Sequence, residues 1–182
     1  MMNKNIVLAF PGSGKSYLVK KYKNVVDNDF CYFKFIYDKD ARTMTDEELE
    51  ARKGNKEIER LNPNYPENLI DATFKDLNEN KIVLIPLSMG TYKIFKELQK
   101  NNKLDGITVT MIYPSKDEFD EFIKRYQKRG NSDIFMKYNH ITQFDEWVEI
   151  FNKENVFKKC NIKHDDYLED LLLKLNFNLE LK

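Results

Sequence analysis

The chain contains the stretch Ala9-Phe10-Pro11-Gly12-Ser13-Gly14-Lys15-Ser16, which fits the pattern G-x-x-x-x-G-K-[ST] except that Ala9 replaces the first glycine. An apolar run at 5–10 leads into it and predicts a strand buried on both faces. The spacing of apolar residues at 15–23 predicts a helix directly after it. A glycine-rich turn between such a strand and such a helix can direct successive backbone N–H groups toward phosphate groups. The sequence therefore predicts a phosphate-binding loop.

We expect this loop to bind ATP together with Mg²⁺. Lys15 would contact the terminal phosphates, and Ser16 would offer a hydroxyl ligand to the metal. Ala9 fits the loop if its backbone does not need a positive φ. The alternative, a chance glycine turn before a helix, is disfavoured because the motif has the strand–helix context that its mechanism requires. The predicted nucleotide-binding residues are Pro11, Gly12, Ser13, Gly14, Lys15, Ser16 and Tyr17.

Strand-like and helix-like patterns alternate along the rest of the chain. Short apolar runs at 25–26, 81–87, 106–113 and, more weakly, 157–162 predict further strands. Helical spacing occurs at 66–77, 91–100, 115–126, 144–151 and 167–175. We therefore expect an α/β fold, with a parallel five-stranded sheet flanked by helices in the three-layer, nucleoside/nucleotide kinase-like fold of P-loop NTPases. Residues 1–182 form one predicted domain, with an insertion at about 30–64 and a lid at about 125–140.

The composition excludes some classes of partner. Thirty Lys and Arg residues balance thirty Asp and Glu residues, so no strong overall attraction to nucleic acid or to an anionic membrane is expected. Hydrophobic residues make up 41% of the chain, which is enough for a core, and two cysteines are too few for a disulfide framework. No apolar run reaches the roughly 18 residues of a membrane-spanning helix. We expect a cytoplasmic protein with no membrane partner, and its oligomeric state stays open.

Other parts of the sequence narrow the class of phosphate-loop protein. No Asn-Lys-x-Asp motif is present, which disfavours a GTPase, and the chain is too short for the extra strands of motor ATPases. These observations favour a small kinase. The third predicted strand ends at Ile85-Pro86-Leu87-Ser88 without a carboxylate. An acidic residue that assists the metal must therefore come from elsewhere in the chain.

Asp27 and Asp29 follow the second predicted strand and can supply that carboxylate. Successive strand residues alternate between faces, so we expect both side chains to point the same way. This Asp-x-Asp arrangement resembles that of shikimate-kinase-like small-molecule kinases. The resemblance implies that Asp27 lies near the metal and that Asp29 is a catalytic residue holding the acceptor hydroxyl. The alternative is a polar turn after a strand, where Asp and Asn are common.

Arg125 and Arg129 lie four residues apart in the helix after the fourth predicted strand. From one helix face, both guanidinium groups can reach one polyphosphate. We expect them to be catalytic lid residues that neutralise charge during phosphoryl transfer, with Gly130-Asn131 as a stop and a hinge. The alternative is a solvated basic helix end.

Several of these motifs occur together in an order that resembles a known family. They are the Phe-Pro-Gly lead-in of the loop, Asp27-Asn28-Asp29, 62–68, Tyr113-Pro114 and 125–131. The set resembles the adenylate-kinase-like P-loop kinases of the bacteriophage type, described as nucleotide or nucleoside kinases, over roughly residues 5 to 175. The resemblance implies a fold and a phosphotransferase class rather than a particular acceptor.

We expect a small-molecule nucleotide or nucleoside acceptor between the end of the second strand, the insertion and the helix near Pro66. Aromatic rings beside Asp29 could stack on a base, although the same rings could simply pack on the sheet. These rings belong to Phe30, Tyr32, Phe33, Phe35 and Tyr37, and weaker phosphate-contact candidates are Arg42, Arg52, Arg60 and Ser88.

Two alternative functions stay open. One is a kinase acting on DNA or RNA ends or on a modified base in DNA, with nucleic acid as a less favoured partner. The other is a nucleotide-dependent binding or regulatory protein without kinase turnover.

Overall fold

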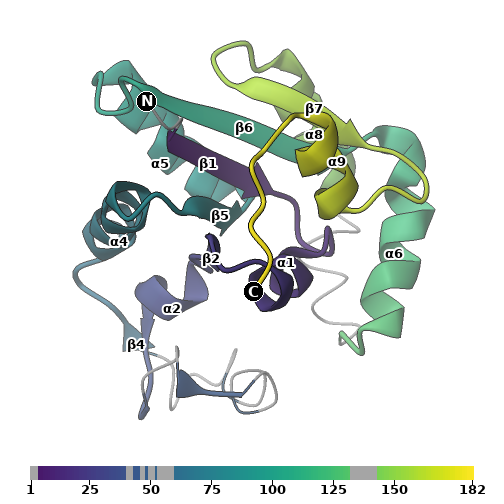
Figure 1. Ribbon diagram of the computed structural model, residues 1–182. Coiled ribbons are helices and arrows are strands. Elements are labelled where there is room, and N and C mark those ends of the chain that lie inside the picture. Colours follow the sequence, from purple (N-terminus) through teal and green to yellow (C-terminus); the bar gives the residue numbers. More distant parts are fainter. Residues whose placement is uncertain (1–3, 40–42, 46–47, 49–51, 53–59, 132–142) are drawn as a thin grey trace.

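A parallel sheet of five strands lies at the centre of the computed structural model, which describes residues 4–39, 43–45, 48, 52, 60–131 and 143–182. The strand order is β2-β5-β1-β6-β7 (Figure 1). The strands are β1 (Lys4–Ala9), β2 (Val25–Asp27), β5 (Ile82–Pro86), β6 (Ile107–Pro114) and β7 (Lys158–Ile162). The flanking helices are α1 (Lys15–Lys21), α4 (Glu67–Asn78), α5 (Met89–Lys100), α6 (Phe119–Lys128), α8 (Phe144–Lys153) and α9 (Leu168–Lys174). The α/β fold predicted from the sequence is confirmed.

Helices cover both faces of the sheet and give the molecule three layers. Helices α1 and α9 lie on one face, and α4, α5 and α8 lie on the other (Figure 1). This distribution is the one that right-handed crossovers between parallel strands produce for this strand order. Because the strands are parallel, their carboxyl ends share one edge of the sheet, and the loops that follow β1, β2 and β5 meet there.

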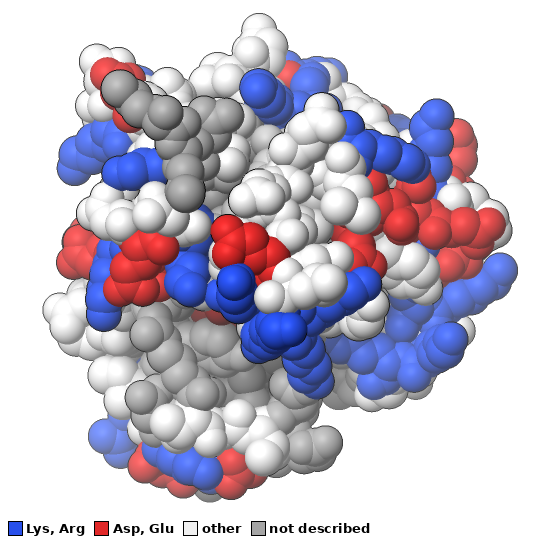
Figure 2. Space-filling view, viewed as in Figure 1, with Lys and Arg blue, Asp and Glu red and all other residues white. Residues whose placement is uncertain are grey.

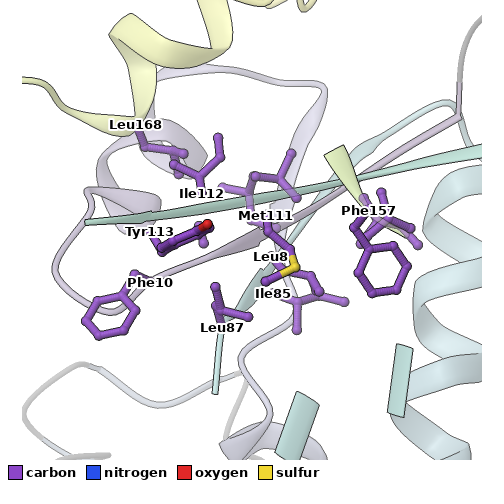
Figure 3. Packing of buried hydrophobic residues seen from close by; sticks show 14 of the residues in the cluster. Leu8, Phe10, Ile85, Leu87, Met111, Ile112, Tyr113, Phe157 and Leu168 are labelled. Carbon is purple, nitrogen blue, oxygen red and sulfur yellow. The ribbon is translucent and has the colours of Figure 1, made fainter. Parts of the chain in front are cut away.

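β1 is the central strand and is buried on both faces. The side chains of Ile6, Val7 and Leu8 have no exposed surface. Leu8 pairs in register with Ile85 of β5 and with Met111 of β6, and the three side chains meet in the core (Figure 3). Apolar residues on both faces are expected for a parallel strand between two helical layers. The predicted phosphate-binding loop therefore begins at the end of a strand whose last four residues are buried.

Some helix starts differ from the sequence prediction. Pro66 is the residue before α4 and not its first helical residue. Ser115 makes no side-chain capping bond, and a short 3₁₀ turn, η2 (Lys116–Glu118), leads into α6 instead. Helix α5 begins earlier than predicted because Ser88 and Thr91 form a capping box, in which Ser88 Oγ accepts a hydrogen bond of 3.2 Å from the Thr91 N–H.

The predicted insertion at about 30–64 is described only in part. Helix α2 (Cys31–Lys34) follows β2, and β3 (Phe35–Ile36) pairs antiparallel with β4 (Arg60–Leu61). Arg42 lies outside the described residues, as do residues 132–140 of the predicted lid. Within the described ranges, none of the helices combines the length and the apolar character needed to cross a membrane.

A buried carboxylate joins α5 to the turn between α8 and β7. Glu154 accepts hydrogen bonds from the Tyr92 hydroxyl, from Lys96 Nζ at 2.9 Å, and from the backbone N–H groups of Asn155 and Val156 at 2.8 and 2.7 Å. Burial alone would raise the pKa of Glu154, but these hydrogen bonds outweigh it and lower the pKa to about 2. The carboxylate therefore stays charged over the whole neutral range and holds the two elements together.

Glu154→Gln is expected to lower the free energy of unfolding by about 2 kcal/mol at neutral pH. The pKa of the folded state lies below the unfolded value, so the contribution is complete above that value and is lost as the pH falls through the acid range. Urea unfolding at neutral pH and at about pH 3 should show that the difference in the free energy of unfolding between this variant and wild type is smaller in acid. Glu146→Gln, on the exposed side of α8, is the control. A difference in the free energy of unfolding that does not change with pH would contradict the assignment of Glu154 as a stabilising charged carboxylate.

Candidate active site

The predicted phosphate-binding loop has the backbone geometry that its glycines favour. β1 ends at Ala9, which is an extended strand residue, so a methyl group fits where the motif has its first glycine. Gly12 and Gly14 have φ angles of +79° and +106°, a region that side chains with a Cβ rarely adopt. Gly14 lies directly before α1, and the Leu18 N–H donates to its carbonyl at 3.3 Å. The turn therefore delivers the chain from β1 directly into the N-terminus of α1.

Neighbouring helices hold this loop from two sides. The Phe10 ring packs edge-on against Phe122 of α6, with 5.7 Å between ring centroids, and also contacts α8. The Tyr126 hydroxyl donates to the Pro11 carbonyl at 3.0 Å, and burial raises the pKa of Tyr126, so this donor keeps its proton. From the other side, the Leu168 N–H at the start of α9 donates to the Ser13 carbonyl at 2.9 Å. The loop is therefore braced before any ligand binds.

Gly12→Ala is expected to destabilise the protein by about 2 kcal/mol or more. An added Cβ would lie 2.9 Å from Tyr126 Cε1, in a residue whose φ is +79°. Gly106→Ala is the matched control: φ there is +75°, but an added Cβ meets no heavy atom within 4 Å. In the control, the free energy of unfolding should fall by only about 1 kcal/mol, which is the cost of a positive φ angle for a residue with a Cβ. Urea unfolding measures both variants, and equal losses would show that Tyr126 does not press against the loop.

A cavity of about 440 Å³ opens beside the loop at the carboxyl edge of the sheet. It brings together the predicted residues Pro11, Gly12, Gly14, Lys15, Ser16, Tyr17, Asp27, Asp29, Arg125 and Arg129. Ser13 is fully buried behind this wall, where it contributes backbone contacts. Within the part of the chain that the structure describes, Lys15 has no carboxylate at ion-pair distance, so its positive charge is available to the cavity.

Asp27 and Asp29 both line the cavity, while the residue between them faces away. Asn28 is buried and donates from Nδ2 to Asp76 Oδ2 of α4 at 2.9 Å. Asp29 Oδ1 accepts the Cys31 N–H at 2.9 Å, at the start of α2. The alternation expected for a strand end is therefore present, and α2 sets the orientation of the Asp29 carboxylate.

Ser16 and Asp27 are compatible with a magnesium ion. Both offer oxygen atoms to the same cavity, one as a hydroxyl and one as a carboxylate. Mg²⁺ is commonly bound by one or two protein oxygens, with water and substrate phosphates completing its octahedron. The donor set beside the loop fits that pattern.

Arg125 and Arg129 reach the cavity in different ways. Arg125 is mostly buried: its Nε donates to Glu121 Oε1 at 3.1 Å, lowering the pKa of Glu121, and its Nη1 donates to the Asp166 carbonyl at 3.2 Å. Arg129 is exposed at the C-terminal cap of α6, where Gly130, with φ of +80°, ends the helix. Lys and Arg side chains gather over α1 and the C-terminal half of α6 (Figure 2). Arg125 is thus rigidly held, whereas Arg129 has room to move.

Sequence reasoning did not find Tyr167, which lines the cavity at the start of α9. Its ring lies 4.7 Å from Arg125 Cζ, its Cδ1 would lie 3.7 Å from a Cβ added to Gly14, and 51% of its surface is exposed. Its place at the start of the last predicted helix was the available signal, but only the fold brings it to the loop. Other wall residues that were not assigned to this site are Cys31, Pro86 and Lys128, and Asn131 of the predicted hinge also lies in the wall.

The weaker candidates have other contacts. Phe30 lines the cavity, but Phe33 is buried in the core of the protein. Arg52 donates from Nε to Asp38 Oδ1 at 2.7 Å, and Arg60 is exposed in β4. Ser88, as described above, caps α5.

Comparison with known proteins gives one similar sequence and one similar structure. No family model matches the chain. Tetraacyldisaccharide 4'-kinase of Pelagibacter ubique (strain HTCC1062) is 30% identical over a region that covers 66% of this chain and 40% of that protein. The chain therefore spans less than half the length of that relative.

The tunicamycin resistance protein of Deinococcus radiodurans has a similar structure. It aligns with a TM-score of 0.53 over 98% of this chain and 99% of its own, at 12% sequence identity. The sequence similarity is therefore to part of a protein that is named as a kinase. The structural similarity concerns the fold alone, which is an α/β fold built on a parallel five-stranded sheet.

Proposed function

We propose that this chain is an ATP- and Mg²⁺-dependent phosphotransferase that acts on a nucleotide, a nucleoside or a related component of nucleic acids. The observation that carries this proposal is the convergence of Lys15, Asp27, Asp29 and Arg129 on one cavity. These residues come from α1, β2, the turn after β2 and the end of α6. Phosphoryl transfer depends mainly on positioning and charge neutralisation, and this set offers both.

Each residue has a distinct task in the proposed transfer. The loop N–H groups and Lys15 bind the phosphates of ATP, and Ser16 with Asp27 would hold Mg²⁺, which offsets charge on the phosphate oxygens. Asp29 orients the acceptor hydroxyl and takes its proton as the acceptor oxygen bonds to the γ-phosphorus. The bond from that phosphorus to the bridging oxygen breaks, and ADP leaves with the electron pair. Arg129 neutralises the charge that spreads over the transferred group.

The base of the nucleotide would lie against Tyr167. The guanidinium carbon of Arg125 lies 4.9 and 4.7 Å from the ring centroids of Phe122 and Tyr167. This cation thus holds the Tyr167 ring beside the loop, while about half of the Tyr167 surface stays exposed. A tyrosine ring can stack on any base, so this surface favours nucleotide binding without selecting one base.

The acceptor would approach from the side of Asp29, Phe30 and Cys31, which line the cavity away from α6. A half-buried aromatic ring beside the carboxylate suits a base or a sugar ring. The sequence similarity to tetraacyldisaccharide 4'-kinase favours a second candidate acceptor, the hydroxyl of a saccharide. Both acceptors present a hydroxyl to Asp29, so the same residues would carry either transfer.

The test is a phosphotransfer assay with γ-labelled ATP, Mg²⁺ and a panel of nucleosides, nucleoside monophosphates and saccharides. We expect label to appear in at least one acceptor and to disappear when the metal is chelated. Lys15→Ala protein prepared in the same way controls for contaminating kinases. Tight ATP binding without transfer to any acceptor would instead favour a nucleotide-dependent binding protein.

A further inference from the structure

A second cavity, of about 740 Å³, lies at the amino edge of the sheet, away from the phosphate-binding loop. It shares none of its described wall residues with the candidate active site. Its wall comes from the starts of β1, β5 and β7, from β6, from the end of α4 and from the C-terminal segment 175–180. Nothing in the proposed phosphoryl transfer uses this cavity.

The cavity exists because α1 is too short to cover the sheet. α1 has seven residues and is about 10 Å long, whereas β6 has eight residues and extends about 26 Å. The C-terminal segment crosses this face instead (Figure 1). It is fastened to Asn24, whose Nδ2 donates to the Asn178 carbonyl at 2.7 Å and whose Oδ1 accepts the Glu180 N–H at 2.9 Å. This segment forms one wall of the cavity.

The floor of the cavity is polar, which is unusual for a parallel sheet. Asn5 of β1 pairs in register with Thr108 of β6, and Thr110 pairs with Lys158 of β7. Because residues in register share a face, these four side chains belong to the same side of the sheet, and all four line the cavity. On the opposite face of β6, Val109 and Met111 are buried. Because side chains alternate along β6, its hydrogen-bonding side chains lie on the face where a packed helix would require apolar side chains.

The walls carry an excess of positive charge. Five lysines and two glutamates line the cavity, and one of those glutamates, Glu180, is paired with Lys23 at 3.4 Å. The other lysines are Lys4, Lys81, Lys158 and Lys159, and among the residues that the structure describes none of them has a carboxylate at ion-pair distance. Three of them donate to uncharged oxygen atoms: Lys4 to Asn78 Oδ1 at 2.7 Å, Lys81 to the Lys23 carbonyl at 3.0 Å and Lys159 to the Asn152 carbonyl at 2.8 Å. Ammonium, hydroxyl and amide groups together form a donor-rich surface that suits an anion with several oxygen atoms.

We propose that this cavity is a second binding site, which takes a small molecule carrying a chain of phosphate groups. Its volume of about 740 Å³ lies in the range of small-molecule binding sites. The ligand binds between the Thr108–Thr110 floor and the C-terminal segment, with lysines on two sides. Its phosphate chain is that of a nucleotide or of a free polyphosphate.

The proposal is tested by calorimetric titration with inorganic tripolyphosphate. Lys81→Gln combined with Lys158→Gln removes one charge from the wall and one from the floor of the cavity, and it should weaken this binding at least tenfold. Thr108→Val removes a floor hydroxyl without changing the charge and should weaken it about fivefold. Lys93→Gln combined with Lys100→Gln, on exposed positions of α5, removes the same charge elsewhere and should have no effect.

Lys15→Ala separates the two sites, because it weakens anion binding at the phosphate-binding loop and leaves this cavity intact. Tripolyphosphate binding that survives Lys15→Ala and falls with the Lys81 and Lys158 substitutions supports the proposal. Loss of all binding in Lys15→Ala, or equal losses in the α5 control, would overturn it. A parallel titration of Lys15→Ala protein with ADP identifies the source, because binding at the loop is weakened there: tighter binding of ADP than of tripolyphosphate assigns the site to a nucleotide, and weaker binding assigns it to a free phosphate chain. Neither result depends on kinase turnover.

Discussion

Lys15→Ala is expected to lower ATP affinity or kcat/KM by roughly 100-fold or more while leaving the fold intact. Lys15 lines the loop cavity and, within the described residues, has no ion-pair partner. Its charge therefore takes part in no salt bridge among these residues, and we expect its removal to lower the affinity for ATP and not the free energy of unfolding. Calorimetry with ATP, steady-state kinetics and urea unfolding measure the three quantities separately.

Lys20→Ala is the matched control for this variant. Lys20 lies on the same helix, is exposed and does not line the cavity. It should leave ATP affinity, turnover and the free energy of unfolding close to those of wild type. If Lys15→Ala bound and turned over ATP like this control, the assignment of the loop as a phosphate-binding site would be wrong. If Lys15→Ala unfolded instead, the residue would have a structural role that its place on the cavity wall does not suggest.

The loop and its two aspartates were predictable because local rules determine them. Gly12 and Gly14 have positive φ angles, which other residues rarely adopt, so the glycines of the motif predict the backbone conformation of the loop. Asp27 and Asp29 reach one cavity because side chains alternate along a strand, and that period can be counted in the sequence. Both predictions needed only neighbouring residues and the expectation that β1 and β2 are parallel strands of one sheet.

The remaining walls of the site depend on contacts between distant segments. Tyr167 reaches the loop because α9 starts beside Ser13, which lies more than a hundred positions earlier in the chain. The guanidinium of Arg125 was predicted to act on phosphates, but its hydrogen bonds to Glu121 and to the Asp166 carbonyl were not foreseen. Hydrophobic periodicity and helix-cap patterns in the sequence do not predict such contacts between distant residues. They follow from which helices pack on which face of the sheet.

Helix starts show a third kind of limit, in which two local patterns compete. Both Ser115 and Ser88 precede helical stretches, and each could serve as an N-terminal cap. Ser88 does so because Thr91 completes a reciprocal pair with it, whereas a 3₁₀ turn follows Ser115. Ser115 is followed three positions later by Glu118, which is the spacing of a capping box. The side chain of Glu118 instead accepts the His164 N–H at 2.9 Å, so a long-range contact overrides the local one.

Asp29→Asn should reduce phosphotransfer by roughly 100-fold or more while ATP binding survives. The substitution keeps an oxygen that can accept the Cys31 N–H, so the start of α2 should keep its shape. It removes the negative charge that the proposed mechanism uses to orient the acceptor and to take its proton. ATP affinity should persist because the loop N–H groups, Lys15 and Ser16 make those contacts in the proposed complex.

Asp27→Asn should behave differently, because the proposed role of Asp27 is beside Mg²⁺. We expect it to weaken ATP binding when Mg²⁺ is present and to have little effect when the metal is chelated, whereas Asp29→Asn should leave both affinities unchanged. Asp71→Asn, on an exposed position of α4 away from the cavity, controls for the loss of one charge. The measurement pairs ATP calorimetry, with and without Mg²⁺, with phosphotransfer to the best acceptor of the panel. Equal and small effects from both substitutions would reduce Asp27 and Asp29 to a polar turn, and the shared cavity would then have no acid to assist the acceptor.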